Sequence, residues 1–220
     1  GVSLNVNGDR TNAIFGTETH CIAGQPYLQE TFAGLTIQIR PDTFFQVNTE
    51  TAEALLQVVI DNLNLQGTET LLDAYCGIGT MTLPLAQRVK QAIAMEIQPE
   101  AIQQAQQNAI LNNLNNISFQ IGSVEDLLPA LTIQPDIILL DPPRKGCSKT
   151  VIETLLQKQP QRIIYISCNP ATLARDLKAL CQPGNYQLGR VQPADFFPQT
   201  AHVECAAFLE RSSALSDVKD

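Results

Sequence analysis

The feature that most constrains the fold is a regular alternation of short apolar runs with amphipathic stretches, which begins near Thr49 and occupies most of the chain. Several of the runs are almost continuously apolar, as in strands covered on both faces of a parallel sheet. Alternation of such strands with helices predicts a doubly wound, Rossmann-like α/β domain. The expected strands are Leu71–Tyr75, Ala92–Met95, Ile117–Ile121, Ile137–Leu140 and Ile163–Ile166.

Helices are predicted between these runs. Residues Thr49–Leu63 carry apolar side chains at helical spacing. Pro99 begins a second helix at its first position, and Asn169 caps a third that begins at Pro170. Residues from Tyr186 to about Leu209 are expected to form two strands, an antiparallel end to the sheet.

The first 45 residues have a different pattern. Val2–Asn7 and Leu35–Arg40 alternate apolar and polar residues, which predicts half-buried strands. We expect residues 1–45 to be a β-rich remnant of a preceding central domain whose natural N-terminus has been cut away. Residues 46–210 would form the α/β domain, and residues 211–220 a polar tail.

Charge and cysteine usage narrow the function classes. The net charge is −8 and the sequence pI is about 4.7, which argues against a stand-alone nucleic-acid binder. No apolar run approaches the roughly 20 residues of a membrane helix, and the start has no secretory pattern. None of the six cysteines forms a C-x-x-C pair, so we expect no metal, and free thiols in a reducing cytoplasm.

Ligand-binding residues are expected where the strands end, because doubly wound sheets bind ligands at their carboxyl edge. Gly77 and Gly79 follow the first strand, allowing a tight turn that a ligand can approach closely. Glu96 ends the second strand, where an acid can hold ribose hydroxyls, and Asp141 ends the fourth. Glu96 as a solvated acid and Asp73 as a loop hydrogen-bonder are the structural alternatives.

Cys168 is the main candidate nucleophile, because it follows a buried strand and directly precedes the helix capped by Asn169. A helix N-terminus favours the thiolate, so we expect a lowered pKa for this thiol. Cys76 is the rival candidate, although its place in the glycine turn favours packing under a ligand. Cys181 and Cys205 are expected to be packed thiols.

Two further pairs lie at i and i+2 on extended segments. His202 and Glu204 are expected to share one strand face. Glu204 has apolar neighbours that would raise its pKa and suit a general base, the alternative being a structural carboxylate. For His202 a structural role is favoured over direct proton transfer. Gln46 and Asn48 carry amides that can hydrogen-bond a ligand or base.

Taken in order, these segments resemble the RNA (uracil-5-)-methyltransferases, both the ribosomal and the transfer-RNA branches. The resemblance covers about residues 10 to 210. It rests on FFQVN from Phe44, DAYCGIG from Asp73, DPPRKG from Asp141, SCNPAT from Ser167 and PQTAHVE from Pro198.

The resemblance implies an S-adenosylmethionine-dependent enzyme that forms 5-methyluridine. Cys168 would attack carbon 6 of uracil, and Glu204 would act as the base. The residues that would contact S-adenosylmethionine are Gln46, Tyr75, Glu96 and Asp141. Thr80 stands where some members carry an asparagine that makes the same contact, which puts that contact in doubt.

The family also implies an RNA partner, a uridine of ribosomal or transfer RNA, and a cytoplasmic monomer with no membrane contact. Its RNA-binding barrel, and the iron–sulfur cluster of some members, lie outside these 220 residues. Loss of a basic RNA-binding surface would account for the acidic pI. The residues expected on the substrate side are Asn48, Arg144 and His202, with Lys145, Lys149 and Arg175 near the phosphates.

Three alternatives stay open. An amino-methyltransferase would also use Asp141-Pro142-Pro143, but it carries an aromatic residue where Arg144 stands and needs no cysteine. A nicotinamide-dependent oxidoreductase is disfavoured because the third glycine of G-x-G-x-x-G is missing. A non-catalytic RNA-binding protein is disfavoured by the intact Cys168 and Glu204.

Overall fold

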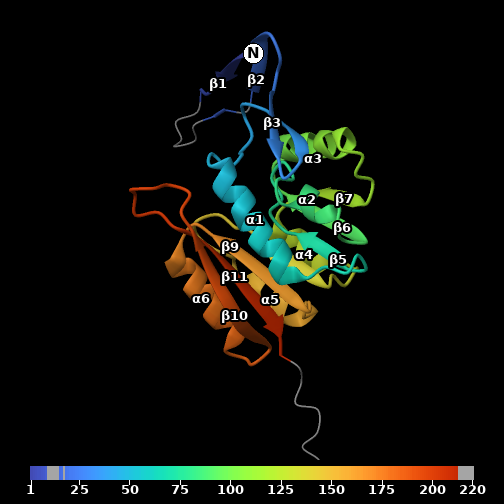
Figure 1. Ribbon diagram of the computed structural model, residues 1–220, viewed down its shortest axis with the longest axis vertical. Helices are drawn as coiled ribbons and strands as arrows, with labels where there is room; N and C mark the ends of the chain where they lie inside the picture. The colour runs from blue at the N-terminus through green and yellow to red at the C-terminus, as the bar shows by residue number, and fades with distance from the viewer. Residues whose placement is uncertain (9–14, 17, 213–220) are drawn as a thin grey trace, which may run out of the picture.

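The computed structural model describes residues 1–8, 15–16 and 18–212, and a seven-stranded sheet forms its centre (Figure 1). The strand order is β10-β11-β9-β8-β5-β6-β7. The strands from β5 to β9 pair in parallel, whereas β11 is antiparallel to both β9 and β10. The predicted doubly wound sheet with antiparallel C-terminal strands is confirmed. The strands are β5 (Thr70–Asp73), β6 (Gln91–Glu96), β7 (Ile117–Ile121), β8 (Ile137–Leu140), β9 (Arg162–Ser167), β10 (Tyr186–Ala194) and β11 (Glu204–Arg211).

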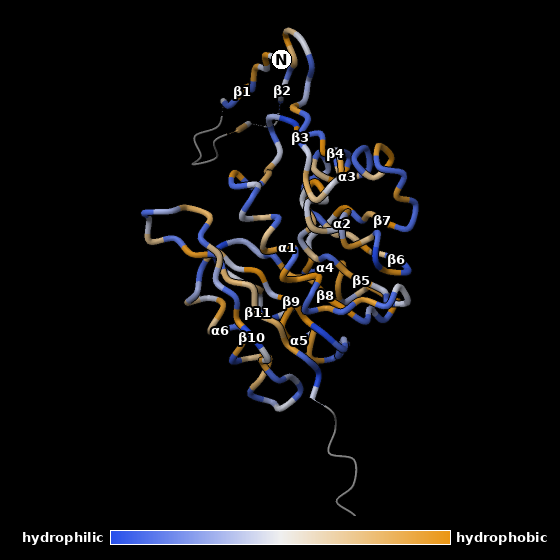
Figure 2. The backbone as a smooth tube through the Cα atoms, viewed as in Figure 1, coloured by the Kyte–Doolittle hydropathy of each residue, from blue (hydrophilic) through white to orange (hydrophobic). Residues whose placement is uncertain are grey.

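Both faces of the sheet are covered, which explains the continuous apolar runs. Leu71 and Leu139 point into one core, whereas the next residues along their strands, Leu72 and Leu140, point into the other. The first core is closed by α1 (Thr49–Leu63), α2 (Thr82–Ala86) and α3 (Pro99–Leu111). The second is closed by α4 (Val124–Ala130), α5 (Lys149–Lys158) and α6 (Pro170–Cys181). Figure 2, in which the backbone is coloured by residue hydropathy, shows many hydrophobic residues along the central strands.

The helix starts are those that local chemistry predicts. The Asn48 side chain accepts a hydrogen bond from the backbone N–H of Thr51 at the start of α1. The Asn169 side chain accepts one from Ala171 at the start of α6, and Pro170 occupies the first turn. Pro99 likewise begins α3. All three predicted helices are confirmed.

The N-terminal segment forms two hairpins, β1 (Val2–Val6) with β2 (Glu18–Ala23) and β3 (Leu28–Phe32) with β4 (Leu35–Ile39). The first projects from the body of the molecule (Figure 1). Its residue Val2 is 55% exposed, so the prediction of a half-buried strand was wrong there, because no second layer of the described residues covers it.

The second hairpin, by contrast, is part of the first core. Ile37 of β4 is fully buried. The backbone N–H groups of Thr36 and Gln38 donate to the side-chain oxygens of Asn112 and Asn108 beside α3. The expected domain boundary at residue 45 falls between the β3–β4 hairpin and the α/β domain, although the hairpin contributes side chains to the first core of that domain. Residues 213–220 of the predicted polar tail lie outside the described residues.

The connections from β5 decide where a ligand can bind. β5 lies between β6 and β8, so the strands that follow β5 are added first on one side of it and then on the other. In open α/β sheets, ligands bind beyond the carboxyl ends of the strands at such a switch point. Among the described residues, no helix has the length and apolar character needed to cross a membrane.

Candidate active site

A pocket lies at the switch point, beyond the carboxyl ends of β5 and β8. Five of the residues predicted to bind the cofactor line it, together with Asp73 and Phe44. The five are Gln46, Tyr75, Gly77, Thr80 and Asp141. They come from three segments of the chain, so only the folded sheet brings them together.

The two glycines of the turn after β5 serve different purposes. Both have positive φ, +53° at Gly77 and +89° at Gly79. A Cβ built on Gly77 would meet no atom within 4 Å, so the backbone there is open toward the pocket. A Cβ on Gly79 would lie 2.9 Å from Cγ of Leu83, so this glycine lets α2 pack against the turn. Gly79 therefore supports the pocket without lining it.

Glu96, at the end of β6, braces the same turn. One carboxylate oxygen accepts a hydrogen bond from the Gly77 N–H at 3.2 Å, and the other accepts one from Gln98 at 2.9 Å. The side chain is partly exposed. The structure thus places Glu96 next to the pocket through Gly77, and the carboxylate keeps a side that a hydroxyl group can approach.

Two carboxyl groups that line the pocket, Asp73 and Asp141, have raised pKa values. Asp73 is 2% exposed and accepts a 2.6 Å hydrogen bond from the Thr82 hydroxyl. Burial raises its pKa to about 6. The pKa of Asp141 is raised well above its usual range by burial first, and then by the charges of Glu204 and Asp73. Thr82 was not identified from the sequence, because nothing local indicates that its hydroxyl meets Asp73.

Cys168 and Glu204 lie at the same edge of the sheet, where β9 and β11 pair. Burial of the thiol raises the pKa of Cys168, and the nearby charge of Glu204 raises it further. A hydrogen bond from Arg144 lowers it by less. The predicted lowering of the Cys168 pKa was therefore wrong in direction: Asn169 caps α6 as expected, but burial disfavours the charged thiolate.

Glu204 is 9% exposed, and burial raises its pKa to about 7. His202 does not share its strand face, because β11 begins only at Glu204 and His202 lies in the exposed loop before it. Its backbone N–H donates to the Thr200 hydroxyl, and its ring packs edge-on against Phe197 at 6.2 Å. The prediction that both residues lie on one strand was wrong, and His202 is exposed whereas Glu204 is buried.

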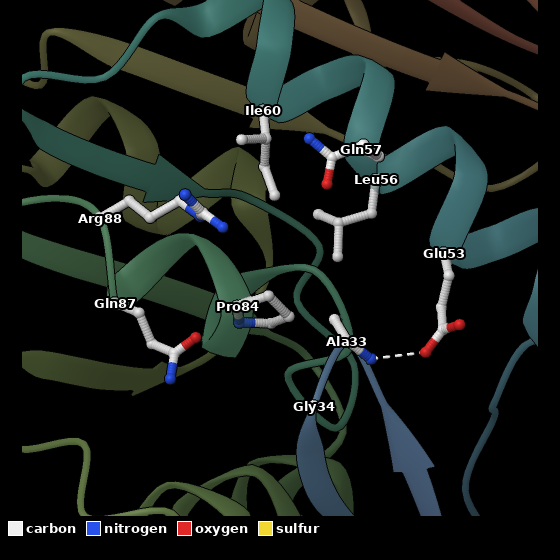
Figure 3. Close-up of a pocket in the computed structure, with 9 residues that line it drawn as sticks. All are labelled: Ala33, Gly34, Glu53, Leu56, Gln57, Ile60, Pro84, Gln87 and Arg88. Atoms are coloured by element: carbon white, nitrogen blue, oxygen red, sulfur yellow. Dashed lines mark hydrogen bonds between the residues drawn. The ribbon is translucent and has the colours of Figure 1, made fainter.

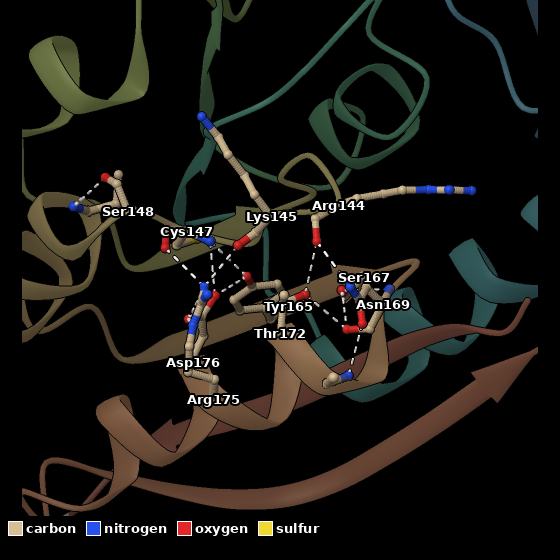
Figure 4. A network of polar contacts seen from close by, with 12 residues as sticks. Arg144, Lys145, Cys147, Ser148, Tyr165, Ser167, Asn169, Thr172, Arg175 and Asp176 are labelled. Atoms are coloured by element: carbon tan, nitrogen blue, oxygen red, sulfur yellow. Dashed lines mark hydrogen bonds and ion pairs between the residues drawn. The ribbon is translucent and has the colours of Figure 1, made fainter.

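Two further predicted substrate residues have clear structural surroundings. The amide of Asn48 caps α1 and also donates to the carbonyl of Phe196 at 3.4 Å, so both of its polar atoms bond within the protein. Arg144 has an exposed side chain, and its carbonyl accepts hydrogen bonds from Asn169 and Thr172 of α6 (Figure 4).

A second pocket lies elsewhere, between α1, α2 and the β3–β4 turn (Figure 3). There the Ala33 N–H donates to the Glu53 carboxylate at 2.6 Å, and Arg88 stands opposite. None of the predicted site residues lines this pocket. The chemistry-bearing residues thus gather at the switch point and not here.

Comparison with known proteins identifies the family to which the chain is similar. Residues 19–212 match the family model described as tRNA (uracil-5-)-methyltransferase. An uncharacterized RNA methyltransferase of Nostoc sp. (strain PCC 7120) is 66% identical over 217 residues, 99% of this chain and 47% of the relative. One from Synechocystis sp. (strain PCC 6803) is 51% identical over 210 residues, 96% of this chain and 45% of the relative. The chain spans about half the length of these curated relatives.

Solved structures show the same core. A Pyrococcus abyssi tRNA (uracil-54, C5)-methyltransferase in complex with S-adenosyl-L-homocysteine superposes with a TM-score of 0.80 and 30% identity, over 93% of this chain and 49% of that one. M. jannaschii TYW2 in complex with AdoMet has a TM-score of 0.60 and 20% identity, over 90% and 92% of the two chains. The second likeness concerns the fold alone.

Proposed function

This chain belongs to the tRNA (uracil-5-)-methyltransferase family, and from that premise we propose that it transfers a methyl group from S-adenosylmethionine to carbon 5 of a uridine in RNA. The observation that carries the proposal is the meeting of Cys168 and Glu204 at the sheet edge that also forms the switch-point pocket. A thiol nucleophile and a carboxylate near its ionisation point at neutral pH are the groups that this reaction needs.

The switch-point pocket fits S-adenosylmethionine. The open backbone at Gly77 leaves room for a ligand, and Glu96 has an accessible side for ribose hydroxyls. Four pocket side chains would hold the rest of the molecule: Gln46, Tyr75, Thr80 and Asp141. Bound S-adenosylmethionine supplies an electrophilic methyl group on its sulfonium, which becomes attached to carbon 5.

In the proposed reaction Cys168 makes carbon 5 reactive. Its thiolate attacks carbon 6 of the uracil, a carbon–sulfur bond forms, and the displaced electron pair becomes an enolate with nucleophilic character at carbon 5. Covalent catalysis of this kind divides one difficult step into easier ones. The hydrogen bond from Arg144 to Cys168 favours the thiolate that begins the sequence.

Glu204 completes the reaction as the general base. After methylation, carbon 5 carries both the new methyl group and its original proton. The Glu204 carboxylate removes that proton, the carbon 5–carbon 6 double bond re-forms, and Cys168 leaves as a thiolate. A pKa of about 7 for Glu204 means that the carboxylate form is well populated near neutral pH and still basic enough to accept the proton.

We propose that the substrate side of the site includes Arg144, Asn48 and His202. The uridine must leave its stack to reach Cys168, and the exposed basic residues near α6 would meet its flanking phosphates. The family description favours a tRNA uridine, with ribosomal RNA as the alternative. We also propose a cytoplasmic monomer, which light scattering of the purified protein would test.

A covalent trap tests the proposal. The protein is mixed with 5-fluorouridine-containing tRNA and S-adenosylmethionine, and a denaturing gel compares wild type with Cys168→Ala. Fluorine cannot leave carbon 5 as a proton, so a carbon 5 methylase stops as an RNA adduct. We expect a shifted band that is absent in Cys168→Ala. A band that persists in the variant would rule out Cys168, and methylated product without any adduct would rule out the covalent route.

A further inference from the structure

The loop from Arg144 to Cys147, which follows β8, is held along its length by the first two turns of α6 (Figure 4). The Thr172 hydroxyl donates to the carbonyl of Arg144 at 3.2 Å. The Arg175 guanidinium donates to the carbonyls of Lys145, at 3.0 Å, and Cys147, at 3.3 Å. These α6 residues are spaced by three, so one helix face binds the backbone of the loop.

Asp176 is the buried centre of this arrangement. It is 2% exposed, and its carboxylate accepts hydrogen bonds from the Tyr165 hydroxyl at 2.6 Å and from the Cys147 N–H at 2.9 Å. Its other oxygen accepts the Arg175 Nε–H at 2.8 Å. A buried carboxylate is tolerated only when its oxygens are paired in this way. Asp176 therefore joins β9, α6 and the loop at one point.

The loop packs closely against α6 at Gly146. Gly146 has φ of +76°, and a Cβ there would lie 2.5 Å from an oxygen of Asp176 and 2.6 Å from a nitrogen of Arg175. Cys147 also belongs to the apolar cluster against which Tyr75 of the switch-point pocket packs. The loop is thus tied to α6 on one side and to the pocket on the other.

The loop begins with Arg144, the residue whose side chain influences the proposed nucleophile, Cys168. The carbonyl of this arginine accepts hydrogen bonds from Asn169, which directly follows Cys168, and from Thr172. The Arg144 side chain lowers the pKa of the Cys168 thiol. Any shift of the loop along α6 would move this cation away from the sulfur. The cation is the group that favours the thiolate against burial and against Glu204.

We propose that Arg175 and Asp176 are positioning residues of the methyl-transfer site: they hold the loop against α6 so that the Arg144 guanidinium stays beside the Cys168 sulfur. The inference rests on the proposed function only in taking Cys168 as the nucleophile. In this role neither residue contacts the methyl donor. Arg175 was expected near the RNA phosphates, but its guanidinium donates to Asp176 and to the carbonyls of the loop.

Alkylation of Cys168 tests the inference without RNA or S-adenosylmethionine. The protein is treated with iodoacetamide between pH 6 and pH 10, and the Cys168 peptide is followed by mass spectrometry. Arg144→Ala sets the scale: a rise of one unit in the thiol pKa slows alkylation at pH 7.5 by about tenfold. We expect Arg175→Ala and Thr172→Val to slow it in the same direction by about threefold, a shift of roughly half a unit.

Matched variants separate positioning from general damage. Thr172→Ser keeps the hydroxyl and should restore the wild-type profile, whereas the isosteric Thr172→Val should not. Lys178→Ala, an exposed position in the last turn of α6, should leave the profile unchanged. Asp176→Asn should shift the pH profile of Cys168 alkylation the most. If this variant does not fold, Arg175→Ala and the two Thr172 variants test the inference.

Two results would overturn the inference. The first is that Arg175→Ala and Thr172→Val keep the wild-type dependence of Cys168 alkylation on pH while Arg144→Ala is alkylated more slowly. The second is that Arg144→Ala is alkylated at the wild-type rate. A failed fluorouridine trap together with shifted alkylation profiles would contradict the proposed reaction and leave the positioning intact.

Discussion

Glu204 and Cys168 stand opposite each other at the end of the β9–β11 ladder. Ser167 pairs with Cys205 as the last antiparallel pair, so the next residues on the two strands are Cys168 and Glu204. Because the strands run in opposite directions, the start of β11 meets the end of β9. Residues from two distant motifs thus become direct electrostatic neighbours, and the charge of Glu204 raises the pKa of Cys168.

The first prediction concerns the ionisation of Cys168. Since burial and Glu204 both raise its pKa, the alkylation midpoint of the RNA-free protein should lie above that of an ordinary thiol. Asp141 raises it as well, so Glu204→Gln removes one of three causes and should lower the midpoint toward the ordinary value. A midpoint below that of a free thiol in the wild type would show that the helix N-terminus dominates after all.

The second prediction concerns release of the product. Glu204→Gln leaves carbon 5 without a base, so Cys168 cannot leave, and a covalent protein–RNA adduct should accumulate with ordinary uridine RNA. We expect turnover to fall by about two to four orders of magnitude. Gel-shift under denaturing conditions and methyl-transfer rates measure both. Normal turnover in Glu204→Gln would mean that another group takes the proton.

The third prediction concerns stability and pH. Burial raises the pKa of Glu204 from the usual 4.5 to about 7, so the folded state binds the proton more tightly than the unfolded state. Its contribution to the free energy of unfolding therefore declines as pH rises from about 4.5 to about 7, and is constant above that range.

Glu204→Gln cannot lose this proton, so it should become more stable than wild type as pH rises through that window, by up to about 3 kcal/mol. Urea unfolding of both proteins at pH 5 and pH 8 measures the difference. A stability difference that is the same at both pH values would contradict the raised pKa of Glu204.

The fourth prediction separates the two glycines of the turn. Gly77→Ala adds a methyl group where no atom lies within 4 Å, so it should weaken S-adenosylmethionine binding while costing only about 1–2 kcal/mol of stability from its positive φ. Gly79→Ala meets Leu83 and should mainly destabilise the fold. Calorimetric titration and thermal unfolding of the pair measure the two effects. Equal losses of affinity in both variants would count against ligand contact at Gly77.

The fifth prediction concerns Gly146. Its replacement by alanine meets Asp176 and Arg175 at less than 3 Å and also strains a positive φ, which together should cost about 2–4 kcal/mol. Gly184→Ala is the control, because its φ is similar (+80°) and a Cβ there meets no atom within 4 Å. Equal unfolding temperatures for the two variants would show that the loop can move away from α6.

The elements that the sequence predicted well are those whose cause is local. α1 begins and ends where its apolar spacing indicates, because Asn48 caps one end and periodicity sets the other. β8 was recognisable because both of its faces are buried. The first hairpin was judged wrongly because alternation in β1 shows that a strand has two different faces, and not that a second layer covers one of them.

The candidate site divides in the same way. Position after a strand indicated Cys168 and the glycine turn, and apolar neighbours indicated Glu204. Their proposed roles follow from those local facts and from the family. The tertiary structure alone decided how these groups ionise, since burial and the charge of Glu204 on the opposite strand raise the pKa of Cys168, which the local sequence had predicted to be lowered.

Contacts between distant segments were also beyond the sequence. No local pattern indicates that Asp176 would bind Tyr165 and the Arg144–Cys147 loop. Nor does the sequence show that β11 begins only at Glu204, after His202. Periodicity and capping act over a few neighbouring residues, so the sequence determines where helices and strands begin. Solvent exclusion and charge act between segments that only folding brings together, so the tertiary structure decides the chemistry of the groups at the site.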